Sequence, residues 1–143
     1  MMHELLASPV DPLPPEIYDG YVDNLQRSLA AMATQETSSA QAWRFLGDAI
    51  NLMHTLVING ICADPDDAIQ DSVDVMKAAG QSYIDNKPMH LTEDELAKVR
   101  GVTDDFLSVI DQIPYRTFVQ CHRKTEVRVQ AYRTSKRFDV VSL

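Results

Sequence analysis

Several residue types are scarce in this chain of 143 residues, and each scarcity excludes a class of protein. Two cysteines, Cys62 and Cys121, are too few for a disulfide scaffold. Five glycines supply neither a Gly-rich loop that cradles phosphates nor a Gly-x-Ser-x-Gly turn around a serine nucleophile. Polar residues interrupt the most apolar stretch, 52–61, which is far shorter than a membrane span.

The first ten residues also lack the apolar core of a secretory signal, because Glu4 and Pro9 flank the short apolar run between them. We therefore expect a cytoplasmic protein with free thiols and no membrane segment. Hydrophobic residues make up 45% of the chain and charged residues 24%, close to the averages of globular proteins, which excludes a wholly disordered chain. This length predicts a single folded domain with one core.

Basic residues are scarce in most of the chain. Residues 1–114 carry 6 Lys+Arg against 19 Asp+Glu, a net charge of −13, whereas residues 115–143 carry 7 against 2, a net charge of +5. The formal net charge of −8 therefore combines an acidic body with a basic end. Two surfaces of opposite sign favour oriented docking on a partner.

Proline is concentrated at the N-terminus, where residues 1–15 hold four of the seven prolines. Because proline fixes φ and lacks an N–H donor, this segment is predicted to be an extended N-terminal arm. A helical bundle domain is expected over residues 16–134, followed by a C-terminal tail over residues 135–143. The tail ends in a short β-prone run, 138–143, which would either be loose or pack as an extended strip.

Apolar residues recur every three or four positions in five segments, the spacing of one helix face. The stripes cover residues 18–32, 39–59, 69–83, 99–113 and 115–132. The second segment is apolar around most of its circumference, which is typical of a helix in the middle of a bundle. The predicted fold class is therefore all-α: a single-domain bundle of about five helices with a central apolar second helix.

The second segment leaves only a narrow polar strip. This strip consists of Arg44, Asp48, Asn51, Thr55 and Asn59.

Signals for helix ends lie between the segments. Gly60 is a left-handed stop for the second helix. Asp64 is the predicted N-cap of the third helix, with Pro65 in its first turn. Thr92 and Glu95 have the spacing of a capping box at the start of the fourth helix.

Residues that could hold a metal or perform catalysis are few and badly spaced. Cys121 and His122 are adjacent, so on a helix they point about 100° apart and cannot share a metal or a proton. We interpret His122 as a core-facing histidine and Cys121 as a small, half-buried hydrophobic residue. Glu126 lies four residues after His122 on the last helix, whereas a di-iron bundle needs two Glu-x-x-His pairs and two further glutamates. We expect no metal, no cofactor and no enzymatic activity.

Arg116, Arg123, Lys124 and Arg128 are predicted to share one face of the last helix, opposite its apolar stripe. We regard these four residues as the candidate partner-binding surface. Clustered cations on one helix face are typical of nucleic-acid binding, so a nucleic-acid-binding regulator is one hypothesis. The acidic body disfavours it, because its field repels phosphates. A protein partner is the preferred hypothesis, with a second copy of the chain, giving a homodimer, as one version of it.

The sequence from Tyr115 to Arg128 resembles the C-terminal helix of small uncharacterised helical proteins encoded on phages and mobile elements of proteobacteria. The matching residues are Arg116, Thr117, His122, Arg123, Thr125, Glu126 and Arg128. The segment from Trp43 to Leu56 resembles the central helix of these proteins. The resemblance brings no known activity, but it implies a non-enzymatic accessory protein that acts by protein–protein binding and inhibits or modulates a host factor.

Overall fold

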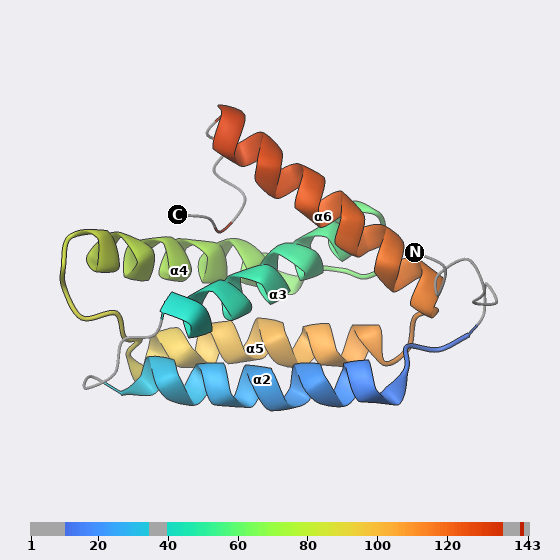
Figure 1. Ribbon diagram of the computed structural model, residues 1–143, viewed down its shortest axis with the longest axis horizontal. Helices are drawn as coiled ribbons and strands as arrows, with labels where there is room; N and C mark the ends of the chain where they lie inside the picture. The colour runs from blue at the N-terminus through green and yellow to red at the C-terminus, as the bar shows by residue number, and fades with distance from the viewer. Residues whose placement is uncertain (1–10, 35–39, 136–140, 142–143) are drawn as a thin grey trace.

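Five α-helices follow one another in the residues that the computed structural model describes, which are 11–34, 40–135 and 141 (Figure 1). They are α2 (Pro15–Ala33), α3 (Ala40–Ile58), α4 (Ala68–Ile84), α5 (Glu93–Ile110) and α6 (Tyr115–Ser135), with a short 3₁₀ turn, η1 (Pro65–Asp67), before α4. The described residues contain no strand, so the all-α prediction is confirmed. Helix α2 includes Pro15 and α6 includes Ser135, each one residue outside the range 16–134 predicted for the bundle.

Helix α3 lies at the centre and packs against each of the other four helices. Helices α2 and α5 run antiparallel along one side, α4 lies beside α3, and α6 crosses α3 obliquely so that its C-terminal half projects from the bundle (Figure 1). The prediction of a central second helix is confirmed. In the described part of the chain, no helix has an apolar stretch long enough to cross a membrane.

The core is formed by the predicted helix stripes, with small shifts. Leu25 and Met32 of α2, Val73 and Met76 of α4 and Phe106 of α5 are buried, as their spacing predicted. Toward the end of α5 the buried residue is Ile110, whereas the predicted Val109 and Ile113 are only half-buried. The indole Nε1–H of Trp43 donates to the main-chain carbonyl of Met76 at 2.7 Å and joins α3 to α4 inside this core.

Two of the three predicted helix-end signals are confirmed. Gly60 has a φ of 73° and follows the end of α3, where the N–H of Ile61 donates to the carbonyl of Leu56 at 2.9 Å. The hydroxyl of Thr92 accepts from the N–H of Glu95 at 3.2 Å, and the Glu95 carboxylate accepts from the N–H of Thr92 at 2.9 Å, which completes a capping box.

The predicted N-cap at Asp64 is wrong in detail. The η1 turn comes first, and Asp67 is the N-cap of α4, without a side-chain hydrogen bond. The carboxylate of Asp64 instead accepts from the N–H of Ile69 at 3.2 Å, inside the first turn of α4. The sequence signal therefore located the start of the helix but missed the intervening turn, whose Asp66 and Asp67 have left-handed φ values of 58° and 55°.

The end of the Pro-rich arm lies against the loop before α6. The N–H of Tyr115 donates to the carbonyl of Asp11 at 2.7 Å, Pro12 forms an isolated bridge with Pro114, and Leu13 is buried. These contacts hold the first turn of α6 against the start of α2. Residues 1–10 of the predicted arm lie outside the described residues.

Candidate functional site

Helix α6 carries all four predicted site residues, and its inward face differs from the predicted one. The residues that face α3 are Phe118, Cys121 and Thr125, which are buried, and Arg128, which is half-buried. His122 was expected in this stripe, but its side chain is 48% exposed and its Nδ1 lies 3.2 Å from a carboxylate oxygen of Glu126. The expectation of a core-facing His122 is therefore wrong.

The polar strip of α3 explains this rotation of α6. Asn51 and Thr55 are 1% and 0% exposed, with Thr55 packed against α6 and Asn51 packed against both α6 and Val141. The hydroxyl of Thr125 lies 2.6 Å from that of Thr55 and 2.7 Å from the carbonyl of Cys121. A buried polar group is costly unless it is hydrogen-bonded, so α6 must present polar partners at this position.

Arg128 completes this polar contact and turns away from the predicted exposed face. Its Nη1 donates to the carbonyl of Asn51 at 3.2 Å and to the hydroxyl of Thr55 at 2.8 Å. Its Nη2 lies 2.9 Å from Nδ1 of His54. A guanidinium group has only donors, so Nδ1 of His54 accepts and the ring is neutral in this contact. We call these four residues together with Thr125 the polar seam.

The other three predicted cations lie at different positions around α6. Lys124 is exposed, and its Nζ donates to Oδ1 of Asn59 at 2.7 Å, just beyond the C-terminal end of α3, where a positive charge is favourable. Arg123 is exposed and Arg116 is half-buried. The predicted four-residue surface is thus divided between a structural contact and an outer face.

The outer face of α6 is narrow and mixed in character. Residues spaced by four, three and four lie on one side of a helix, and here they form the side opposite the polar seam. We call this set the outer ridge: Arg116, Gln120, Arg123 and Val127. Val127 is 69% exposed, more than any other exposed large hydrophobic residue in the described part of the chain.

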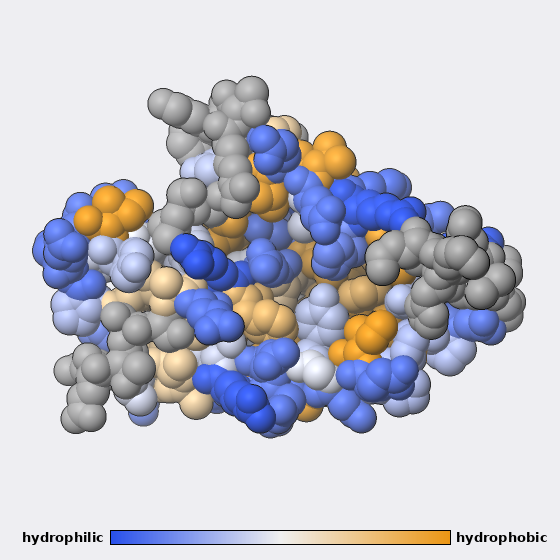
Figure 2. All heavy atoms as spheres, viewed as in Figure 1, coloured by the Kyte–Doolittle hydropathy of each residue, from blue (hydrophilic) through white to orange (hydrophobic). Residues whose placement is uncertain are grey.

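A groove of about 510 Å³ lies between α6 and the helices α2 and α3. Its lining is mixed: Phe45, Leu52 and Val129 are apolar, and we call them the apolar floor, whereas Asp48 and Glu126 supply carboxylates. Figure 2, seen from the same side as Figure 1, shows hydrophobic and hydrophilic side chains next to each other in the band between α2 and α6, and mostly hydrophilic ones along the lower edge. The groove therefore combines an apolar floor with negative charge.

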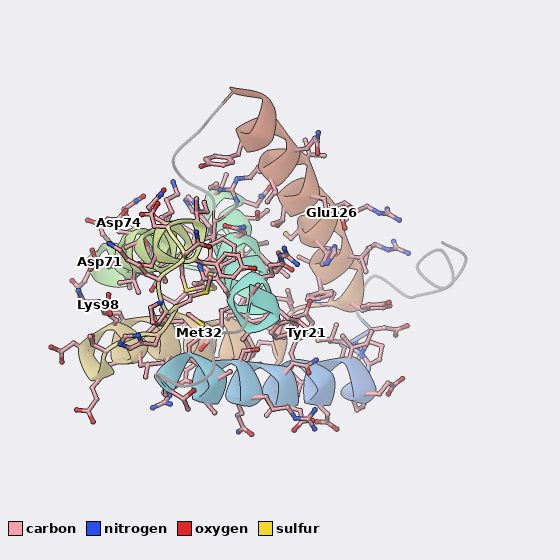
Figure 3. All side chains as sticks on the ribbon, turned by 60° about the vertical axis from the view of Figure 1, so that its left-hand side comes forward. Tyr21, Met32, Asp71, Asp74, Lys98 and Glu126 are labelled. Carbon is pink, nitrogen blue, oxygen red and sulfur yellow. The ribbon has the colours of Figure 1, made fainter. Side chains whose placement is uncertain are left out.

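Tyr21 lies at one end of this groove, inside an aromatic cluster. Its ring centroid lies 5.4 Å from that of Phe106 and 5.8 Å from those of Phe45 and Phe118. Burial, and then the charge of Asp48, raise the pKa of Tyr21 to about 12. Its phenol therefore remains a neutral group at physiological pH. Figure 3 shows Tyr21 on α2 close to the first turns of α6, with Glu126 further along α6.

The two thiols are poorly suited to nucleophilic chemistry. Burial raises the pKa of Cys121, although the charge of Lys124 opposes the shift. Burial and then the charges of Asp105 and Asp64 raise the pKa of Cys62. Both side chains are free thiols, and the thiolate form that attacks or binds metals is disfavoured. Within residues 11–34, 40–135 and 141, no three His, Cys, Asp or Glu residues are grouped so that they could hold a metal ion.

Sequence reasoning did not identify the groove. Tyr21, Phe45 and Asp48 belong to ordinary helical patterns, and their convergence depends on the angle at which α6 crosses α3. The only local signal was the polar strip on α3, which is unusual on a helix surrounded by others. Comparison with known proteins gives no relative: no family model matches, and neither the curated proteins nor the solved structures contain a match.

Proposed function

We propose that this chain acts by binding another protein, as a non-enzymatic accessory protein of the kind encoded on phages and mobile elements, and that the groove and outer ridge of α6 form the binding face. The observation that carries the proposal is the groove itself. Helix α6 packs mainly against α3, so an apolar floor remains accessible beside it. Concave apolar surfaces with a few polar groups are the usual places where partners and ligands bind.

The groove suggests the chemistry of the partner. A long side chain with an apolar stem and a positive end, lysine or arginine, would lay its stem on Phe45 and Leu52. Its charge would then lie near Asp48 and Glu126, and the aromatic rings of Tyr21 and Phe45 offer a face for a cation. We therefore propose that the partner inserts a basic residue into the groove.

The outer ridge would contribute orientation more than affinity. Arg116 and Arg123 carry positive charge next to a groove that carries negative charge. A partner with the complementary order of charges would be steered into one orientation, since charged groups at the rim of an interface act mainly on association rate and specificity. The separation of negative and positive charge seen in the sequence would thus orient the partner on a single face of α6.

The position of Arg128 and Lys124 favours protein over nucleic acid. Arg128 faces α3 and Lys124 lies against Asn59, so only two of the four predicted cations, Arg116 and Arg123, belong to the outer ridge. A nucleic-acid site gains affinity with every phosphate that it neutralises. Two arginines beside a carboxylate-bearing groove would give weak binding, and this alternative is therefore the weaker proposal.

Affinity capture with matched variants tests the proposal. The wild-type chain, Glu126→Lys in the groove and Asp104→Lys on the exposed face of α5 would be used to capture proteins from a native lysate. Both substitutions invert one exposed charge, so their effects on folding should be similar. We expect one stoichiometric protein with the wild type and Asp104→Lys, and its loss with Glu126→Lys. Equal recovery with all three proteins, or no recovery with any, would contradict the groove as the binding site.

A further inference from the structure

Val141, in the C-terminal tail, is held on α3 by hydrogen bonds to its main chain. Its N–H donates to Oδ1 of Asn51 at 2.8 Å, and Nδ2 of Asn51 donates to the carbonyl of Val141 at 3.0 Å. Asn51 is 1% exposed and Val141 is 5% exposed. One side-chain amide thus pairs with both main-chain groups of a single residue, as a neighbouring strand would in a sheet.

Gly47 leaves the space on α3 that the side chain of Val141 occupies. A Cβ atom placed on Gly47 would lie 2.8 Å from Cγ1 of Val141 and 3.2 Å from its Cβ. Any larger residue at position 47 would therefore displace the valine side chain. Gly47 and Asn51 are one helical turn apart and lie on the same side of α3. We call the depression formed by these two residues the valine slot.

The valine slot recognises features that are not unique to this tail. It pairs with a main-chain N–H and C=O, which every extended segment offers, and it accepts one branched side chain above Gly47. Main-chain pairing supplies affinity and a side-chain pocket supplies specificity in peptide recognition by strand addition. The ligand class that fits is an extended peptide with a valine at one defined position.

We propose that the valine slot is a peptide-binding site and that the C-terminal tail of this chain is its tethered occupant, which an extended segment carrying a valine can replace. A short tether gives its ligand a local concentration in the millimolar range. A competing segment must therefore bind more tightly than the tail or arrive when the tail has been removed. This proposal is independent of the groove, because Asp48 and Leu52 lie about 100° around α3 from Gly47 and Asn51.

The slot is connected to the placement of α6 through Asn51. The side chain of Asn51 pairs with Val141, whereas its carbonyl accepts from Arg128 of α6 at 3.2 Å and from the hydroxyl of Thr55 at 3.2 Å. The same residue thus contacts the tail and the polar seam. Replacement of the tail by a peptide that makes the same two hydrogen bonds leaves α6 in place.

Binding of a synthetic peptide in trans tests the proposal. The probe is a fluorescein-labelled peptide of residues 138–143, Phe-Asp-Val-Val-Ser-Leu. The protein is the full chain carrying Val141→Asp, because burying a carboxylate at this 5% exposed position is costly and keeps its own tail out of the slot. We expect fluorescence polarisation to give a dissociation constant of about 1 mM or lower. The wild-type chain should bind at least about twofold more weakly, because its tethered tail competes at a local concentration of about 1 mM.

Matched peptides and variants make the outcome specific. Val141→Ala in the peptide should abolish binding, because the side chain of Val141 is the one that lies against Gly47. Adding Asn51→Ala to the Val141→Asp chain should also abolish binding. Equal binding of the peptide to the wild type and to Val141→Asp, or no binding by a folded Val141→Asp chain, would overturn the proposal. If Val141→Asp does not fold, the full chain carrying Val141→Ala replaces it, with the same expectations.

Discussion

Arg128 of α6 and His54 of α3 lie 2.9 Å apart between Nη2 and Nδ1, in a contact where the arginine can only donate. The contact places a cation, which the sequence predicted to be exposed, in the packing between two helices. The contact also requires that Nδ1 of His54 carries no proton, since this nitrogen accepts the hydrogen bond. The polar seam therefore depends on one guanidinium group that reaches three acceptors on α3.

The first prediction concerns this guanidinium. Arg128→Met should lower the free energy of unfolding by about 2–3 kcal/mol, because the buried hydroxyl of Thr55 and the half-buried ring of His54 lose a charged donor. Arg123→Met removes the same group from the outer ridge and should change stability by less than about 0.5 kcal/mol. Urea denaturation of the two variants measures the difference. Equal effects would show that Arg128 has no structural role in the seam.

The second prediction compares two helical glycines. A Cβ on Gly101 would meet nothing within 4 Å, so Gly101→Ala should raise the free energy of unfolding by about 0.5–1 kcal/mol through helix propensity. Gly47→Ala has the same gain in propensity but displaces Val141. Since burial of a valine contributes about 1.5–3 kcal/mol, this variant should be less stable than the wild type by about 1 kcal/mol. If both substitutions changed the free energy of unfolding in the same direction, the contact between position 47 and Val141 would be contradicted.

The third prediction concerns alkaline pH. The folded-state pKa of Tyr21 is raised from 10.0 to about 12, so the folded protein holds this proton more tightly than the unfolded chain. Its contribution to stability is complete below pH 10 and is lost as the pH rises toward 12. Wild-type protein should therefore lose more stability across this range than Tyr21→Phe. Urea denaturation at pH 9 and pH 11 tests this difference, and parallel losses would refute it.

The fourth prediction concerns the thiols. Cys121 is 3% exposed and its pKa is raised, so a thiol reagent should modify it only when the bundle opens. Cys62 is half-buried and should react faster, although its raised pKa keeps it slower than a free thiol. Labelling kinetics of Cys62→Ser and Cys121→Ser separate the two rates. Faster modification of Cys121 than of Cys62 in native protein would be inconsistent with the packing of α6.

Local signals predicted the helices well because their causes are local. The spacing of Val99, Val102 and Phe106 defines one face of α5, and the capping box of Thr92 and Glu95 involves groups only three residues apart. Gly60 adopts its left-handed conformation because glycine has no Cβ, which is a property of that residue alone. None of these features requires knowledge of a neighbouring helix.

The candidate site could be predicted only in part. The basic sequence of α6 correctly drew attention to this helix, but the direction of each side chain depended on α3. The buried hydroxyl of Thr55 required partners, and Thr125 and Arg128 supplied them, whereas the buried amide of Asn51 pairs with the main chain of Val141. His122 consequently lies outside the core, and its ring contacts Glu126 at the edge of the groove.

The sequence by itself determined an all-α chain, the order of its helices, the central place of the second helix and the separation of an acidic body from a basic end. The tertiary structure decided which side of α6 faces inward, where the groove forms and which residue occupies the space above Gly47. The physical reason is that periodicity and capping arise within one helix. The position of a buried hydrogen bond is fixed only when two helices, or a helix and a tail, bring donor and acceptor together.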